Sequence, residues 1–178
     1  DVAILHADQV ATHVFRNMLR PMDDLVVEMG ISASDYPAGV WNAGEVVGHR
    51  YSIPLDIHPM TAFYNADLFT AAGFEAAPMT GDEFEAVAAA ITSGDNKGFD
   101  ITGGFPVQQI FQMMLHQYGG TEFNADGTEA TWNSEAGVKA LQWMKDAQAK
   151  YSEPNLEVDA ELNAFKTGTV GMVWNGIW

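Results

Sequence analysis

The spacing of apolar residues constrains the fold of this chain more than any other feature. Short apolar runs at residues 2–5 and 170–174 predict buried strands, and residues 62–64 predict another short strand. Shorter or alternating runs predict further extended segments at residues 51–55, 99–102 and 131–132. Helical spacing predicts helices that include residues 10–19, 65–73, 80–91, 108–118, 134–144 and 160–166, and residues 23–29 are expected to form a short helix or a turn. Helices that alternate with short strands indicate an α/β fold.

Local signals predict where several of these helices begin and end. Asp8 stands where the N-cap of the first helix is expected, and Arg20-Pro21 is expected to end that helix. The segment from Thr80 to Glu83 matches a capping box, and Ser134 is expected to cap a later helix. A polar connection is predicted between that later helix and residue 160.

Composition excludes several classes of protein. The chain has ten Phe, five Trp and five Tyr and is 47% hydrophobic, so it can form a sizeable core and is not disordered. Its formal charge of -16 argues against binding to nucleic acid or to an anionic membrane surface. It contains no Cys, which excludes disulfides and Cys-ligated zinc.

The ends of the sequence suggest a piece of a longer protein. The first residues read as a strand entered midway, and the last residues stop without a polar tail. The sequence shows no signal peptide and no apolar run of about 18 residues, which is the length of a membrane span.

Asp56 and His58 are the first candidate site residues. They lie on one face of an extended segment, where they can bind a metal, act as acid and base, or hydrogen-bond a ligand. The alternative is a polar pair that is satisfied beside a loop. Because no third ligand follows at a fixed spacing, the metal signal is weak and no metal or cofactor is predicted.

Other site motifs are incomplete or absent. The segment from Glu122 to Asn133 partly resembles a calcium loop, but Asn133 stands where a Glu is required. A hairpin turn around Gly127 is the better interpretation. No pair among the 24 acidic residues is marked as a glycosidase pair, and the Gly-x-Ser-x-Gly and phosphate-loop motifs are absent.

Two Trp residues near the end of the chain have different predicted roles. An indole ring can cover the apolar C–H face of a pyranose while nearby polar groups bind its hydroxyls. Trp174 falls within a buried strand and is predicted to be a core residue. Trp178 follows that strand and is predicted to face a ligand.

Three stretches together resemble one protein family. They are residues 50–69, with Arg-Tyr-Ser-Ile-Pro-Leu-Asp-Ile-His-Pro and Phe-Tyr-Asn-Ala-Asp-Leu-Phe; residues 118–134, with Tyr-Gly-Gly and Trp-Asn-Ser; and residues 164–178, ending in Trp-Asn-Gly-Ile-Trp. In order and spacing the chain resembles the extracellular solute-binding proteins of ABC transporters, in the sugar-binding group that includes maltose-binding protein.

The resemblance implies a periplasmic-binding-protein-like (type II) α/β fold with two lobes that close on a ligand by hinge bending. Residues 1–56 would be a partial N-terminal lobe segment, and residues 57–178 most of the C-terminal lobe. The resemblance also implies a set of ligand contacts. Asp8 would hydrogen-bond sugar hydroxyls, and Trp178 would be a stacking platform. The other implied contacts are Asp56, His58 and Phe105. Asn175 is the implied polar neighbour of Trp178.

The function implied is binding of a sugar or oligosaccharide for uptake through the permease subunits of an ABC transporter, without catalysis. The location implied is periplasmic or extracellular, with lipid anchoring in the full-length form. Members of the family run about twice this length, so exposed apolar surface of the fragment is expected to support a dimer. The alternatives are a glycoside hydrolase that uses acidic residues and a fragment without ligand binding of its own.

Overall fold

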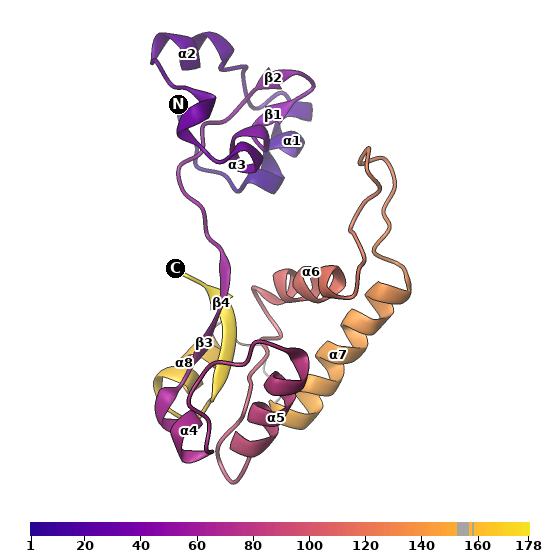
Figure 1. Ribbon diagram of the computed structural model, residues 1–178. Helices are drawn as coiled ribbons and strands as arrows, with labels where there is room; N and C mark the ends of the chain where they lie inside the picture. Colours follow the sequence, from indigo (N-terminus) through magenta and orange to yellow (C-terminus); the bar gives the residue numbers. More distant parts are fainter. Residues whose placement is uncertain (153–156, 158) are drawn as a thin grey trace. The chain divides into compact units, whose positions relative to one another are not determined.

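The computed structural model describes residues 1–152, 157 and 159–178, which form two compact units. Unit 1 is Asp1–His58 and unit 2 is Pro59–Trp178 (Figure 1). The boundary predicted after residue 56 falls close to this division. The assignment of the two units to two lobes stays a prediction.

Unit 1 contains short helices and one small antiparallel ribbon. Its elements are α1 (Ala7–Phe15), α2 (Asp23–Glu28), the 3-10 helix η1 (Ala33–Asp35), α3 (Ala38–Asn42), β1 (Glu45–Val46) and β2 (His49–Arg50). The strand predicted at residues 2–5 is wrong: this segment has no regular structure, and Val2 is 99% exposed. No described strand pairs with it, so its backbone lacks the ladder that would make the run a buried strand.

Helix α1 begins and ends at other residues than predicted. His6 is its N-cap and no side chain caps it, so Asp8 lies within the first turn instead. At the other end Asn17 has φ 56°, and the N–H of Met18 donates to the carbonyl of His13 (3.0 Å). This is the Schellman arrangement, which ends the helix before Pro21 can act.

A buried Arg organises unit 1. Arg50 is 6% exposed, and its Nη1 donates to the carbonyls of Trp41 (2.9 Å) and Ser52 (3.1 Å). Its guanidinium carbon lies 3.6 Å from the centre of the Trp41 ring, and its backbone N–H donates to Asp23 (3.1 Å). This hydrogen bond is the main cause that lowers the pKa of Asp23. Hydrogen bonds and one cation–π contact therefore hold a unit that has little apolar core.

Unit 2 is built on two antiparallel strands with helices around them. Its elements are β3 (Met60–Tyr64), α4 (Ala66–Ala71), α5 (Gly81–Ile91), α6 (Val107–Gln117), α7 (Glu135–Tyr151), α8 (Ala160–Lys166) and β4 (Met172–Gly176). Strands β3 and β4 pair from Met60 opposite Gly176 to Tyr64 opposite Met172. Two isolated parallel bridges extend the ladder, Lys97 to Val170 and Asp100 to Val173.

Three predicted extended segments do not form strands. Residues 51–55 and 131–132 have no strand pairing, and residues 99–102 make only the single bridge at Asp100. Phe99 and Ile101 are nevertheless buried, at 0% and 3% exposure. Burial therefore accounts for the apolar run at 99–102 without a full strand.

The core of unit 2 forms on one face of the β3–β4 pair. Its buried members come from α4, α5, α6, α7, β4 and the segment around residue 100: Phe69, Phe84, Val87, Ala88, Ile91, Phe99, Ile101, Ile110, Ala147, Tyr151 and Met172. Trp174 packs against this cluster, as predicted for a core residue, with ring centres 5.1 Å from Phe99 and 5.3 Å from Phe84. The predicted helix over residues 80–91 is confirmed with its capping box.

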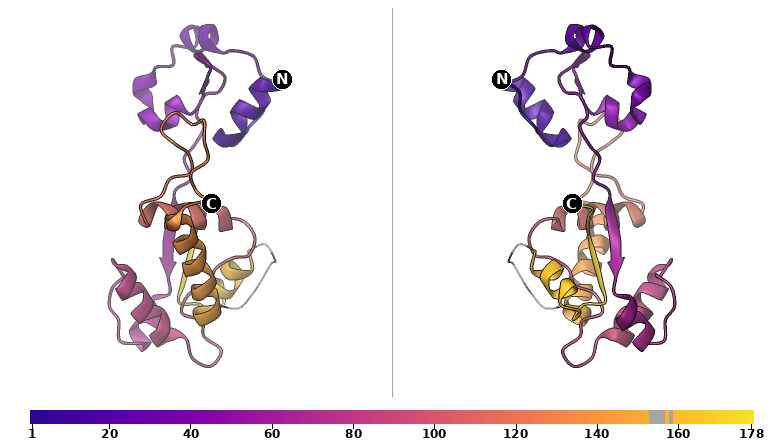
Figure 2. Two further views of the ribbon diagram at one scale, coloured as in Figure 1. Left: turned by 90° about the vertical axis from the view of Figure 1, so that its right-hand side faces the viewer. Right: turned by 90° about the vertical axis from the view of Figure 1, so that its left-hand side faces the viewer.

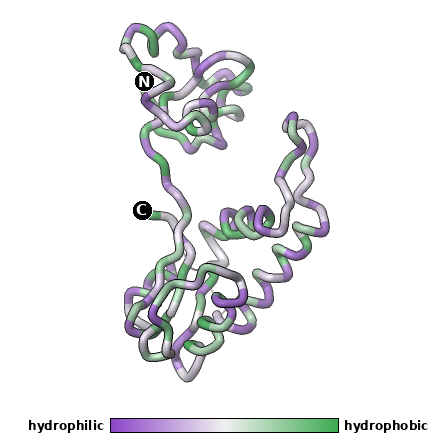
Figure 3. The backbone as a smooth tube through the Cα atoms, in the orientation of Figure 1, coloured by the Kyte–Doolittle hydropathy of each residue, from purple (hydrophilic) through white to green (hydrophobic). Residues whose placement is uncertain are grey.

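The remaining helices cover this core. Helix α8 lies beside β4 in Figures 1 and 2, and its predicted range, residues 160–166, is confirmed. Hydrophobic and hydrophilic residues alternate along α7 (Figure 3), which buries Ala140 and Ala147. Most of the polar connection predicted before α8 lies outside the described residues. Within the part of the chain that the structure describes, no helix combines the length and apolarity needed to cross a bilayer.

Candidate ligand-binding site

Phe105 and Trp178 form an exposed aromatic pair in unit 2. Their ring centres lie 5.4 Å apart and their planes meet at 39°. Phe105 precedes α6 and Trp178 follows β4, so two distant parts of the sequence supply the pair. Phe105 is 45% exposed and Trp178 is 53% exposed, so both side chains are partly accessible from solvent.

The backbone at Gly176 allows this position of Trp178. A Cβ atom at Gly176 would lie 1.6 Å from Cζ3 of the Trp178 ring, so any larger residue would displace the ring. The indole therefore folds back over the end of β4 because the position beneath it has no side chain.

Asn175, which precedes Gly176 in β4, is buried. It is 2% exposed, its Nδ2 donates to Oε1 of Glu161 (3.0 Å), and its Oδ1 accepts the N–H of Gly176 (2.8 Å). These bonds use the amide within the protein. Asn175 is thus a buried residue next to Gly176, near the end of β4.

The other predicted site residues belong to unit 1. Asp8 is exposed in the first turn of α1. Nε2 of His58 lies 2.9 Å from Oδ2 of Asp56, with the two side chains 43% and 60% exposed. The structure brings Asp56 and His58 together in unit 1. It brings Phe105 and Trp178 together in unit 2.

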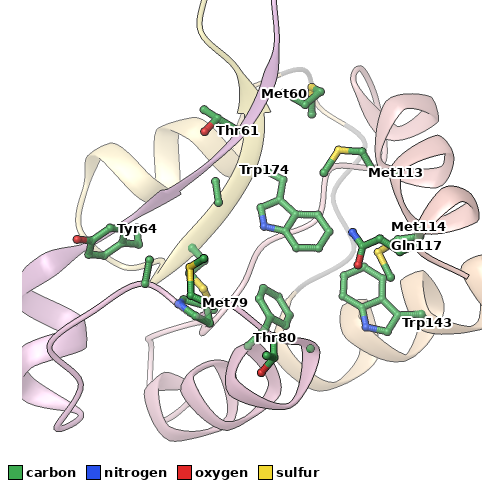
Figure 4. Close-up of a pocket in the computed structure, with 16 residues that line it drawn as sticks. Met60, Thr61, Tyr64, Met79, Thr80, Met113, Met114, Gln117, Trp143 and Trp174 are labelled. Atoms are coloured by element: carbon green, nitrogen blue, oxygen red, sulfur yellow. The ribbon is translucent and has the colours of Figure 1, made fainter.

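A second feature of unit 2 is an apolar cavity that the sequence analysis did not predict. It measures about 430 Å³ and lies between β3, β4, α5, α6 and α7 (Figure 4). Trp143 and Trp174 stack within it, with ring centres 5.3 Å apart and planes at 8°. Its other lining residues include Met60, Tyr64, Met79, Phe84, Met113, Met114, Gln117 and Met172. The apolar positions of the helices were the only sequence signal for this cavity, because the methionines that line it come from separate elements.

The loop that partly resembles a calcium site is a turn. Oδ1 of Asn124 accepts the N–H groups of Thr128 (2.9 Å) and Glu129 (3.1 Å), and Gly127 has φ 71°. Phe123 and Ala130 pair across the turn, which confirms the hairpin interpretation. No group of three or more metal-ligating residues is found in the described chain.

The family model of bacterial extracellular solute-binding proteins matches residues 1–178. The chain belongs to this family. The predicted family resemblance is therefore confirmed. Members of the family are extracellular solute-binding proteins of bacteria.

Solved structures of solute-binding proteins share the fold. An ABC transporter solute-binding protein from Thermotoga lettingae, bound with alpha-D-tagatose, gives a TM-score of 0.85 at 24% identity, over 95% of this chain and 45% of that one. The GacH receptor of Streptomyces glaucescens, solved unliganded and with acarbose, gives 0.80 at 29% identity, over 96% and 44%. The maltotriose-binding protein of Thermus thermophilus, bound with maltotriose, gives 0.75 at 26% identity, over 97% and 46%. The predicted type II periplasmic-binding-protein fold is confirmed.

A curated relative carries a different ligand class in its name. A probable amino-acid ABC transporter periplasmic-binding protein of Sinorhizobium fredii is 34% identical over 122 residues, which is 64% of this chain and 28% of that protein. The chain spans less than half the length of the solved relatives and of this one.

Proposed function

We propose that this chain is part of the substrate-binding component of an ABC transporter, which binds a sugar or oligosaccharide in a cleft between two lobes. The permease subunits would then receive the ligand at the membrane. The proposal includes a periplasmic or extracellular location and a lipid-anchored full-length form. Family membership supports the binding role, and the sugars in the solved relatives support the ligand class.

The exposed pair of Phe105 and Trp178 is the observation that carries the sugar assignment. Each ring is a flat apolar surface, which suits the C–H face of a pyranose. An amino acid presents an ammonium and a carboxylate, which require charged or strongly polar partners. A pair of exposed rings therefore favours a sugar over the ligand class in the name of the Sinorhizobium relative.

The polar site residues have a separate role in this proposal. Asp8, Asp56 and His58 would hydrogen-bond sugar hydroxyls from unit 1. Asn175 would act behind Trp178 rather than touch the sugar, because its amide bonds to Glu161 and Gly176. No catalytic role is proposed for any of them.

Titration calorimetry of the chain tests this function. We expect saturable heat with maltotriose or D-tagatose and no heat with leucine or glutamate. Saturable binding of an amino acid alone would overturn the sugar assignment. Chromatography of the maltotriose after incubation should show it intact, and cleavage products would favour the glycoside hydrolase instead.

A further inference from the structure

The cavity of about 430 Å³ in unit 2 shares no residue with the proposed sugar contacts, because neither Phe105 nor Trp178 lines it. Its wall comes from β3, β4, α5, α6, α7 and the segment before α5. The volume is within the range of small-molecule pockets, about 300–1,000 Å³. The proposed function leaves this cavity unused, so it is available to a different ligand.

Two Trp rings give the cavity a flat apolar wall. Trp143 on α7 and Trp174 on β4 stack with their planes at 8°. Both rings pack against buried core residues, yet both stay partly exposed. Trp174 lies in the middle of the labelled side chains in Figure 4, with Met113 on one side and Met79 on the other. A flat ligand ring against these indoles would remove their remaining apolar surface from water.

Methionine is the commonest residue of this wall. Five of the nine Met residues of the chain line the cavity, and they are Met60, Met79, Met113, Met114 and Met172. The Met side chain is unbranched, so it adapts to the shape of a ligand, and its sulfur makes favourable contacts with aromatic rings. These residues therefore favour an aromatic ligand over a purely aliphatic one.

The wall offers no counter-ion to a ligand, because none of the described residues that line it has a charged side chain. Its polar side chains are those of Thr61, Tyr64, Thr80 and Gln117. The carboxylate of Glu83 lies next to the wall, where its Oε2 accepts the N–H groups of Met79 (2.7 Å) and Thr80 (3.1 Å). Glu83 would repel an anion, and any ion would lose hydration without a charged partner in the wall. The wall therefore fits an uncharged ligand.

We infer that this cavity binds a small, uncharged aromatic molecule at a site separate from the proposed sugar contacts. The ligand ring would lie against Trp143 and Trp174, with methionine side chains at its edge. Ala62 leaves room for this ring, because it pairs with Trp174 across the β3–β4 ladder and lines the cavity. The inference does not depend on the sugar assignment.

Carbon-13 NMR of the methionine methyl groups tests the site, with indole as the probe. The whole chain is labelled at these methyl groups, and single Met-to-Leu substitutions assign the nine resonances. We expect the resonances of the five lining methionines to shift saturably as indole is added. The control is the set that does not line the cavity and should stay in place, namely Met18, Met22, Met29 and Met144.

Two ligands with the same ring test the uncharged class. Indole-3-acetate carries a negative charge and tryptamine a positive charge at pH 7. Both should bind about tenfold more weakly than indole, because the wall offers no charged partner.

A substitution at Ala62 tests the position of the ring. Ala62→Phe fills the space beside Trp174 and should weaken indole binding about tenfold. Ala71→Phe makes the same change at an exposed position of α4 that does not line the cavity, and it is the matched control. If Ala62→Phe does not fold, the methionine resonances of the original chain still decide the inference.

Four outcomes would overturn the inference. If the five resonances stay in place, or if all nine shift together, indole has no specific site in the cavity. If tryptamine or indole-3-acetate binds as tightly as indole, the ligand class is wrong. If maltotriose shifts the same five resonances, the cavity belongs to the sugar site. If these resonances shift with protein concentration alone, a second copy of the chain covers the cavity.

Discussion

At the scale of single residues, unit 1 and unit 2 each bury a charged group, and they do so differently. The Arg50 side chain donates two hydrogen bonds to backbone carbonyls and lies on the Trp41 ring. Glu161 has one oxygen bonded and one without a partner among the described residues. A buried ion needs several partners, so Arg50 is well placed as a cation while Glu161 is better buried with its proton.

The titration of Glu161 gives a prediction with a definite sign. Burial is the main cause that raises its pKa above the ordinary 4.5, and the charges of Asp100 and Asp159 raise the pKa further. The Thr102 hydroxyl and the backbone N–H of Glu161 itself act in the opposite direction and lower the pKa. The stability from this group is therefore complete below pH 4.5 and is lost as pH rises. We expect Glu161→Gln to raise the melting temperature increasingly from pH 5 to pH 8.

Glu135 provides a control of opposite sign for this measurement. It is exposed, and Lys139 lowers its pKa through a hydrogen bond and its charge. Its contribution to the stability of the fold is present above its ordinary pKa and is lost as pH falls. Glu135→Gln should therefore not raise the melting temperature at pH 8. If the difference in melting temperature between Glu161→Gln and the original chain stays constant with pH, the raised pKa of Glu161 is contradicted.

Trp178 gives the second prediction at this scale. Trp178→Ala should weaken maltotriose binding about tenfold or more, since a stacked ring contributes about 0.5–1.5 kcal/mol beyond its buried area. Because the ring is half exposed, the melting temperature should change little. Trp132→Ala removes another half-exposed Trp of unit 2 and should leave affinity unchanged. A large loss of stability in Trp178→Ala would make the ring part of the core.

At the scale of elements, helix ends with local side-chain caps were predictable, and others were not. Thr80, Asn65 and Ser134 accept backbone N–H groups of the helices that follow them. Residues within three positions supply these caps, so a short stretch of sequence contains the whole signal. The end of α1 depended on the left-handed backbone of Asn17, which competes with the later Pro21 signal.

The capping box of α5 gives a prediction at this scale. Oγ1 of Thr80 accepts the N–H of Glu83 (3.2 Å), and Oε2 of Glu83 accepts the N–H of Thr80 (3.1 Å). Thr80→Ala should lower the free energy of unfolding by about 1 kcal/mol in urea denaturation. Thr80→Ser keeps the oxygen and is the control. Equal losses in both variants would show that the hydroxyl does not cap the helix.

At the scale of the whole molecule, the two units differ in how much core they have. The buried hydrophobic residues of unit 1 are Val10 and Val26, whereas unit 2 holds the large aromatic cluster. A unit with so little buried apolar area gains little hydrophobic stabilisation. The solved relatives are more than twice as long, which fits a unit completed by other parts of a larger protein.

Exposed apolar residues of unit 1 predict self-association of the chain. Ile4 is 81% exposed and Val27 is 79% exposed. We expect sedimentation velocity to show a dimer that grows with protein concentration, and Ile4→Ser with Val27→Ser to weaken it. Val138→Ser replaces an exposed residue of α7 in unit 2 and is the control. A monomer at every concentration would contradict this prediction.

The sequence by itself determined what depends on neighbouring residues. Helical spacing and caps predicted α4, α5, α7 and α8. The turn at Gly127 was predictable from Asn124 and its neighbours, and the family motifs indicated the fold. Tertiary structure decided what depends on distant partners. No described strand pairs with residues 2–5, Phe105 meets Trp178 across 73 positions of sequence, and Glu161 on α8 accepts a hydrogen bond from Asn175 on β4. Such contacts join residues that are far apart in the sequence, and a local sequence pattern does not contain the position of a distant partner.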